Sequence, residues 1–195
     1  MFEWLPGVLR EASSLAASLH IEWVSSFAEP ATKDDLLACE DAVSEPLSPS
    51  HRAFLQTYNG ASLALKLPDA PGGVPWATYG VQIFSTREII LETAEVAELF
   101  DAEVRGRNRF LTIARYGREG DRCLADYNRV QGGEAAIVDA FHEVPDDWSS
   151  SPIIAQSFED WLRRLLDGFV SRQEIFWYWM PGDLTVEATI AELST

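Results

Sequence analysis

With 195 residues, the chain is long enough for one large domain with a buried core, and its composition excludes a disordered protein. Hydrophobic residues make up 47% of it, and seven Trp and ten Phe supply large apolar side chains for that core. The formal net charge of −16 disfavours binding to nucleic acid or anionic membranes and favours basic partners, although solubility alone would explain it equally well.

The first part of the chain predicts two helices. Apolar residues recur at helical spacing over residues 7–20, whereas residues 21–24 fit either a short strand or more helix. Thr32 with Asp35 resembles a capping box in which Asp takes the position of Glu. A second helix should therefore begin there and end near residue 45.

A third helix is the best defined by its signals. Ser48 is a good N-cap, and Pro49 occupies the first turn, where its missing N–H does no harm. Asn59 and Gly60 both tolerate the left-handed conformation, so we interpret them as the stop of this helix rather than as a functional loop.

Strands and one more helix are expected in the middle of the chain. Residues 61–67 and 81–84 predict strands on either side of a loop rich in Pro and Gly. Ser85 with Glu88 forms a clear capping box, so a helix should follow to about Phe100.

The remaining elements predict a meander and a closing helix. Three consecutive strands are expected, and they span residues 110–114, 123–127 and 135–141. Ser157 with Asp160 begins a helix that carries Trp161 inward as a core residue. Together these elements predict an α+β fold with a central, mostly antiparallel sheet flanked by helices.

The order of these motifs resembles the SUKH superfamily, also called the Smi/Knr type, over about residues 32 to 168. Two positions depart from the family pattern, since His51 stands where Tyr is usual and Ala61 where a second Gly often follows. The motifs that carry the resemblance are Leu47-Ser48-Pro49 through Asn59-Gly60, Ile83-Phe84-Ser85, Ile113-Ala114, Gly120-Asp121, Asp126 and Ser157-Phe158-Glu159-Asp160-Trp161-Leu162.

The resemblance implies a function as well as a fold. Bacterial members look like immunity proteins, which bind and neutralise a cognate toxin of a polymorphic toxin system, and a fungal relative acts as a cell-wall regulatory scaffold. Neither role uses a catalytic site or a cofactor, so we expect a binding protein and not an enzyme. The expected organisation is an N-terminal helix packed on the domain (1–30), the SUKH-like domain (31–168) and a C-terminal extension, packed on it or at an oligomer interface (169–195).

An acidic run is the first candidate for a partner-binding surface. Glu88, Glu92 and Glu95 fall on one face of the predicted helix, at i, i+4 and i+7, with no Lys or Arg between them. Either this face is simply solvated, or it docks a basic partner such as a nuclease toxin.

Four further residues are expected to contact the partner. Trp76 and Tyr79 lie in the Pro- and Gly-rich loop, where aromatic side chains either cover a core or act as binding hot spots. Asp121 and Asp126 stand at the acidic strand end. In the tail, residues 177–179 alternate two Trp with a Tyr, which makes a homodimer through this segment a reasonable hypothesis.

Basic residues concentrate between residues 105 and 129, which hold seven of the fifteen Lys and Arg. These arginines either pair internally with the acidic helix or form a second surface that faces an anion. No nucleic-acid motif accompanies them, which makes the anion-facing surface the lesser of the two interpretations.

The cysteine and histidine content predicts a reduced, cytoplasmic protein without a metal site. Cys39 and Cys123 show no CxxC spacing, and the three histidines have no metal-ligand spacing. The N-terminus has no signal-peptide pattern, and no stretch reaches the roughly 18 apolar residues of a membrane span. A nucleophile formed by Cys123 with His142 would make a hydrolase, which we keep as a remote alternative.

Overall fold

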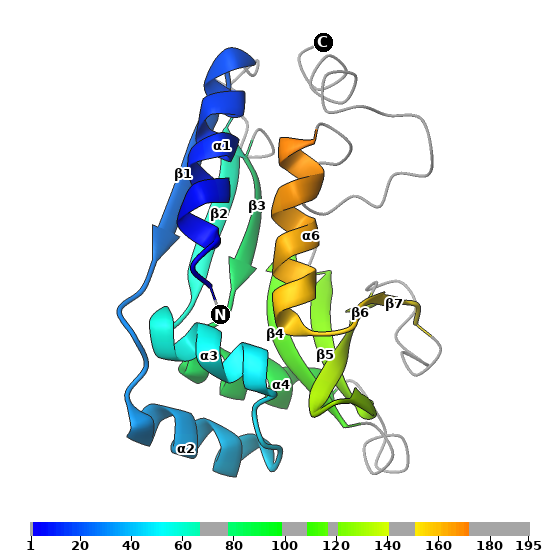
Figure 1. Cartoon of the computed structure of the whole chain (residues 1–195). Coiled ribbons are helices and arrows are strands. Elements are labelled where there is room, and N and C mark those ends of the chain that lie inside the picture. The colour runs from blue at the N-terminus through cyan, green and yellow to red at the C-terminus, as the bar shows by residue number, and fades with distance from the viewer. Residues whose placement is uncertain (1, 67–77, 99–108, 117–120, 141–150, 172–195) are drawn as a thin grey trace.

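The computed structural model of the chain describes residues 2–66, 78–98, 109–116, 121–140 and 151–171 (Figure 1). Its helices are α1 (Leu5–Ser18), α2 (Lys33–Val43), α3 (Pro49–Thr57), α4 (Thr86–Glu98) and α6 (Phe158–Val170). Its strands are β1 (Glu22–Phe27), β2 (Ala61–Lys66), β3 (Thr78–Ile83), β4 (Phe110–Tyr116), β5 (Arg122–Gln131), β6 (Glu134–Ala140) and β7 (Ile153–Ala155).

The strands form one sheet in chain order, β1 to β7, and every neighbouring pair is antiparallel. Strands that follow one another in the chain are therefore neighbours in the sheet, although α2 and α3 lie between β1 and β2 and α4 lies between β3 and β4. Helices cover the sheet on both sides, and α1 and α6 run across the side nearest the viewer in Figure 1. The predicted α+β fold with a helix-flanked antiparallel sheet is therefore confirmed.

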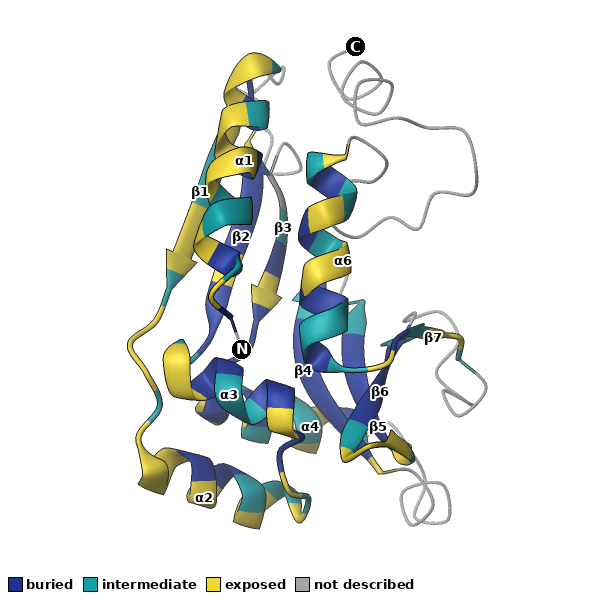
Figure 2. Cartoon of the chain, viewed as in Figure 1, coloured by how far each residue is buried: buried dark blue, intermediate teal, exposed yellow. Residues whose placement is uncertain are grey.

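Successive side chains of a strand point to opposite faces of the sheet, so the core has two parts, one on each face. Side chains such as Leu63, Val81 and Cys123 point to the side of α1, α3 and α6 and belong to the larger apolar cluster. The opposite side of the sheet carries a small cluster under α4, made of Val96, Phe110, Leu124, Val138 and Ala140. Figure 2 shows the buried strand interiors between exposed helix surfaces.

Three helices begin as their sequences predict. The Thr32 hydroxyl accepts from the Asp35 N–H (3.1 Å) while the Asp35 carboxylate accepts from the Thr32 N–H (2.9 Å), which completes the capping box of α2. At α6, the Ser157 hydroxyl accepts from the Asp160 N–H (3.1 Å). At the start of α4, the Ser85 N–H donates to the Glu88 carboxylate and the Glu88 N–H donates to the Ser85 hydroxyl, which forms a second capping box.

The start of α3 differs from its prediction. Ser48 occupies the N-cap position, but its side chain makes no capping hydrogen bond. A distant carboxylate caps the helix instead: Glu134 on β6 accepts from the Ser50 N–H (2.9 Å) and from the Ser50 hydroxyl (2.7 Å). Ser48 donates its N–H to the Tyr127 hydroxyl (3.0 Å). Tertiary contacts therefore supply what a local side chain usually provides.

The Asn59-Gly60 pair also has a wider role than a helix stop. Gly60 adopts a left-handed φ of +99°, and a Cβ there would lie 3.0 Å from the backbone nitrogen of Ser85. Asn59 is not left-handed; its side-chain oxygen accepts from the Thr86 N–H (2.9 Å). The helix ends at Thr57, directly before Tyr58 and this pair, as the predicted stop requires, but only Gly60 adopts the left-handed conformation, and Asn59 bonds to the first turn of α4.

The N-terminal segment supplies more than the helix expected of it. Of the stretch 21–24, which fitted either structure, residues 22–24 belong to β1, and this strand pairs with β2 over six positions. The Trp4 indole N–H donates to Glu159 on α6 (2.8 Å), and the Arg163 guanidinium lies 4.2 Å from the centre of the Trp4 ring system. Both contacts fasten the N-terminal helix to α6.

A histidine lies in the middle of the aromatic core. His51 is fully buried and stacks on Phe158, with ring centroids 4.6 Å apart. Neither ring nitrogen has a hydrogen-bond partner in the described part of the chain. Because burial disfavours the charged imidazolium, the pKa of His51 falls to about 3.

Candidate functional site

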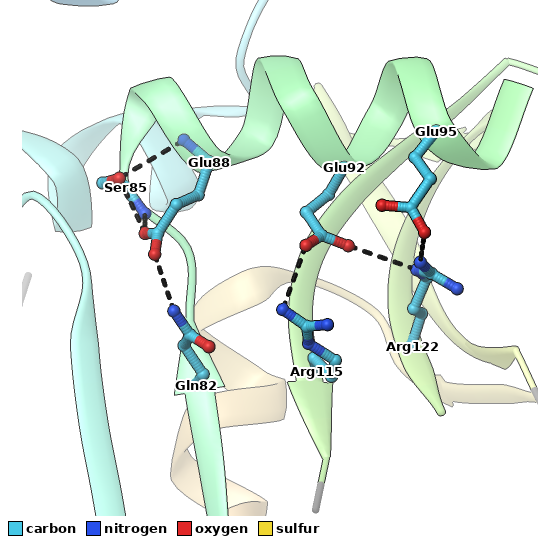
Figure 3. Close-up of polar contacts among 7 residues, drawn as sticks. All are labelled: Gln82, Ser85, Glu88, Glu92, Glu95, Arg115 and Arg122. Carbon is cyan, nitrogen blue, oxygen red and sulfur yellow. Dashed lines mark hydrogen bonds and ion pairs between the residues drawn. The ribbon is translucent and has the colours of Figure 1, made fainter. Parts of the chain in front are cut away.

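The acidic face of α4 begins with a residue that caps its own helix. The Glu88 carboxylate accepts from the Ser85 N–H (2.8 Å) and hydroxyl (2.7 Å), and its other oxygen accepts from the Gln82 amide on β3 (2.6 Å) (Figure 3). Both carboxylate oxygens of Glu88 are thus engaged within the chain. Capping by Glu88 requires its side chain to point back toward β3.

The next two acidic residues face arginines of the sheet. Glu92 lies 3.0 Å from Arg115 on β4 and 3.4 Å from Arg122 on β5, and Glu95 lies 2.8 Å from Arg122 (Figure 3). The side chains of Glu92 and Arg122 are only 13% and 12% exposed. The face that the helical spacing grouped together therefore turns largely toward the sheet.

This arrangement narrows the predicted docking surface of α4. Glu92 is enclosed by two arginines, whereas Glu95 keeps 62% of its side chain exposed and is accessible to a partner. A like-charged row on a helix is unfavourable by itself, but two facing guanidinium groups compensate it here.

The arginine-rich segment forms ion pairs within the chain. Four of its arginines lie in the described residues, and each contacts a carboxylate. Arg109 binds both oxygens of Glu45 at 2.5 Å, and Arg129 donates to Asp126 at 2.5 Å. With Arg115 and Arg122 paired to α4, internal pairing accounts for these four side chains, and the anion-facing surface gains no support from them.

Asp126 is structural rather than accessible. Its residue is 1% exposed, and its carboxylate accepts from the Asn128 N–H (2.8 Å) as well as from Arg129. These bonds lie where the β5–β6 register shifts, between Asp126 and Val130. A buried, doubly bonded carboxylate cannot touch a partner without rearrangement, so the expected contact through Asp126 does not fit its position.

The other predicted contact residues are placed less completely. Asp121 precedes β5, and its carbonyl accepts from the Tyr116 N–H (2.9 Å). Its charge, after burial, helps to raise the pKa of Asp139 to about 6. Tyr79 belongs to β3 and not to the loop in which it was expected; it lies opposite Leu65 of β2, and only its backbone is described. Trp76 and the tail segment 177–179 lie outside the described residues.

Cys123 lies in surroundings that disfavour a nucleophile. The thiol is fully buried and lies 3.5 Å from the Tyr116 hydroxyl, which accepts from the Trp161 indole N–H (2.9 Å). Burial, the largest effect, raises the pKa of Cys123 well above its ordinary value, so the thiolate is suppressed. His142, its suggested partner, lies outside the described residues.

The described residues contain no group of three or more His, Cys, Asp or Glu side chains placed to hold a metal ion. None of their helices is at once long and apolar enough to cross a bilayer.

Other exposed residues escaped the sequence prediction. The outer surface of α2 exposes Asp34, Leu37 and Asp41, which are spaced so that they follow one side of the helix. Their helical spacing was readable in the sequence, but the longer acidic run on α4 gave the stronger signal. The edge position of β1 had no sequence signal, because it depends on which strands pair.

The chain matches the model of a known protein family. A family model described as the SMI1 / KNR4 family (SUKH-1) matches residues 30–164, which is more than half of the chain. The matched region runs from just before α2 into α6, so it contains the strands β2 to β7 but not α1 or β1. No curated protein matches the chain.

Proposed function

Because this chain belongs to the SMI1 / KNR4 family (SUKH-1), we propose that it is an immunity protein of a bacterial polymorphic toxin system. It binds its cognate toxin stoichiometrically and covers the active site or the approach of the substrate. The protein needs no cofactor for this, because no bond is made or broken. The observation that carries the proposal is the family match over residues 30–164.

The charge of the protein supports a basic partner. A net charge of −16 attracts a positively charged toxin domain over a distance and raises its association rate. Several acidic side chains remain exposed for this purpose, among them Asp34, Asp41 and Glu95. Steering of this kind weakens as salt screens the charges.

A binding role also agrees with the chemistry of the cysteines. Cys39 and Cys123 are free and buried, and burial raises the pKa of both thiols, that of Cys39 to about 11. Thiols of this kind are poor nucleophiles and remain stable in a reducing compartment, which supports a cytoplasmic, non-enzymatic protein.

The test is binding to the protein encoded by the adjacent reading frame. We expect the two purified proteins to co-elute at a fixed ratio and the toxin activity to disappear at that same ratio. The association rate should fall with increasing salt, while an unrelated acidic protein of similar size should not inhibit. Adjacent reading frames without toxin activity, or a toxin that stays active at saturating concentration, would reject the proposal.

A regulatory scaffold is the second candidate, because the same family resemblance includes a cell-wall regulator. The same surface would then hold partners without neutralising them. A partner that binds stoichiometrically and keeps its activity in the complex would favour this second role over immunity.

A further inference from the structure

The two edges of the sheet differ in how well they are protected. The β7 edge has three residues, follows Pro152 directly and shifts its register against β6. The β1 edge has six residues in one continuous register with β2, and its sequence, EWVSSF, contains neither Pro nor Lys. Short strands, Pro, Lys and irregular register are the usual devices that prevent further strand pairing, and β1 has none of these.

The hydrogen-bond pattern identifies which backbone groups face outward from β1. Ala28 donates its N–H to the Gly60 carbonyl (3.0 Å), at the position that continues the β1–β2 register. Antiparallel pairs alternate between bonded and non-bonded positions, so Ser26 and Val24 also direct their backbone groups to β2. The N–H and C=O groups of Ser25 and Phe27 therefore point away from β2.

The outer side of β1 is accessible in the described part of the chain. Because β1 is the first strand in the sheet order, no described strand pairs with its outer side. Ser25 and Ser26 are exposed, and Phe27 is half-buried against Tyr58, with ring centroids 4.7 Å apart. Figure 2 shows β1 at the margin of the sheet, with exposed residues along its lower half.

Charge determines what kind of strand fits this edge. Exposed Glu22 begins β1 and exposed Glu29 follows it, with no Lys or Arg between them. Lys66 lies beside Glu22 at 3.6 Å, on the neighbouring strand. A second copy of the chain would bring another net charge of −16 to the same edge, which disfavours self-pairing.

We propose that the β1 edge binds an extended segment of a basic protein, which adds to the sheet as a further strand. Backbone hydrogen bonds to Ser25 and Phe27 would hold the segment, and Glu22 and Glu29 would attract basic side chains near its two ends. The inference rests on the proposed function, because it names the surface and the chemistry of the partner.

A synthetic peptide tests this edge independently of any toxin. The probe is a capped nonapeptide with Lys at its first, fifth and last positions and alternating Val and Thr between them. In the full chain, we expect the peptide to slow amide hydrogen exchange at Ser25 and Phe27 and to leave Ser26 unchanged, because that amide already bonds to β2. The same peptide with Glu in place of Lys should not bind.

A proline variant separates the backbone from the side chain. S25P removes one outward N–H but no β1–β2 hydrogen bond, and edge strands tolerate Pro at such positions. We expect S25P to weaken binding of the Lys peptide roughly tenfold or more, while S25A, which keeps the N–H, binds within about twofold of the native chain. Near-native unfolding midpoints show that both variants fold.

Several results would overturn the inference. The amides of Ser25 and Phe27 could already be protected in the free chain, protected only at high protein concentration, or unaffected by the peptide. The inference would also fail if S25P bound the peptide with unchanged affinity, or if the peptide protected the amides of another element such as α2. Each result leaves the toxin experiment open, and a toxin that fails to bind leaves the peptide result standing, so the two failures are distinguishable.

Discussion

The two sides of the sheet are held to their helices by different forces. On the side of α1, α3 and α6, large aromatic and aliphatic side chains are buried against one another, with Phe158 in contact with Phe54 (5.0 Å between centroids) and Trp161 (5.3 Å). On the side of α4, the small apolar cluster is accompanied by the ion pairs of Glu92 and Glu95 with the sheet.

This difference indicates which side of the sheet contributes most of the stability and which side fixes the orientation of its helix. A fully buried Phe contributes about 1.5–3 kcal/mol by removal of apolar area from water. Ion pairs that remain partly exposed contribute about 0–1 kcal/mol, because solvent and salt screen them. We therefore infer that the aromatic side provides most of the stability, while the arginines fix the position of α4 on the opposite side.

The largest expected effect is on the aromatic side. Phe158→Ala removes a fully buried ring that contacts four aromatic neighbours, and we expect it to lower the free energy of unfolding by about 3–5 kcal/mol. Urea unfolding at neutral pH measures this. Leu91→Ala on α4 is the control, because Leu91 is 59% exposed and its loss should change stability by less than about 0.5 kcal/mol. Equal effects of the two variants would contradict the comparison.

His51 makes the aromatic side sensitive to acid. The unfolded chain binds a proton at His51 below its ordinary pKa of 6.5, whereas the folded chain does so only near 3, so stability falls as the pH decreases through this window. His51→Phe should abolish that loss. The free energy of unfolding of the variant, measured relative to that of the native chain, should therefore rise by about 2 kcal/mol between about pH 7.5 and pH 5.

The titration of Asp139 also changes stability with pH, so its contribution must be separated from that of His51. Burial, and secondarily Asp121, raises the pKa of Asp139 from 3.8 to about 6, so its contribution to stability is lost as the pH rises through 6 and regained on acidification. It opposes His51, which is why the difference between variant and native chain is the quantity to measure. A pH-independent difference would show that His51 is accessible to protons in the folded state.

A smaller loss is expected from the α4 side. Arg122→Met removes both ion pairs of that guanidinium and leaves Glu92, 13% exposed, with Arg115 alone. We expect the free energy of unfolding to fall by about 1–2 kcal/mol. The double variant Arg122→Met with Glu92→Leu should return to within about 1 kcal/mol of the native value, because no enclosed carboxylate remains. A double variant as unstable as the sum of the single ones would contradict this.

The smallest effect is expected at Glu95, whose side chain is 62% exposed. Glu95→Gln should change stability by less than about 0.5 kcal/mol, since Arg122 retains Glu92. In the proposed complex it should slow association and leave dissociation nearly unchanged, as expected for a steering charge. Stopped-flow mixing with the adjacent-frame protein at low salt measures both rates.

Much of the fold could be predicted because its signals are local. Capping pairs at Thr32, Ser85 and Ser157 determine where three helices begin, and the left-handed pair Gly132-Gly133 forms the turn between β5 and β6. The three-residue β7 carries no comparable signal. It exists because β6 offers a neighbouring edge, and its pairing was therefore invisible in the sequence.

The candidate surface was predicted less well, for a physical reason. Helical spacing placed Glu88, Glu92 and Glu95 on one face, but the direction of that face depends on Arg115 and Arg122, which come from strands far along the chain. Asp126 was expected to contact the partner, but it is buried beside Arg129 where the register of β5 with β6 shifts.

The sequence by itself determined the family, the starts of α2, α4 and α6, most of the strand segments and the acidic charge, since all of these follow from spacing and composition within short stretches. Only the tertiary structure decided which charges are enclosed, which carboxylate caps α3 and which strand lies at the edge of the sheet. These features depend on the pairing of residues far apart in the chain, and pairing is set by the sum of all packing contacts rather than by any local pattern.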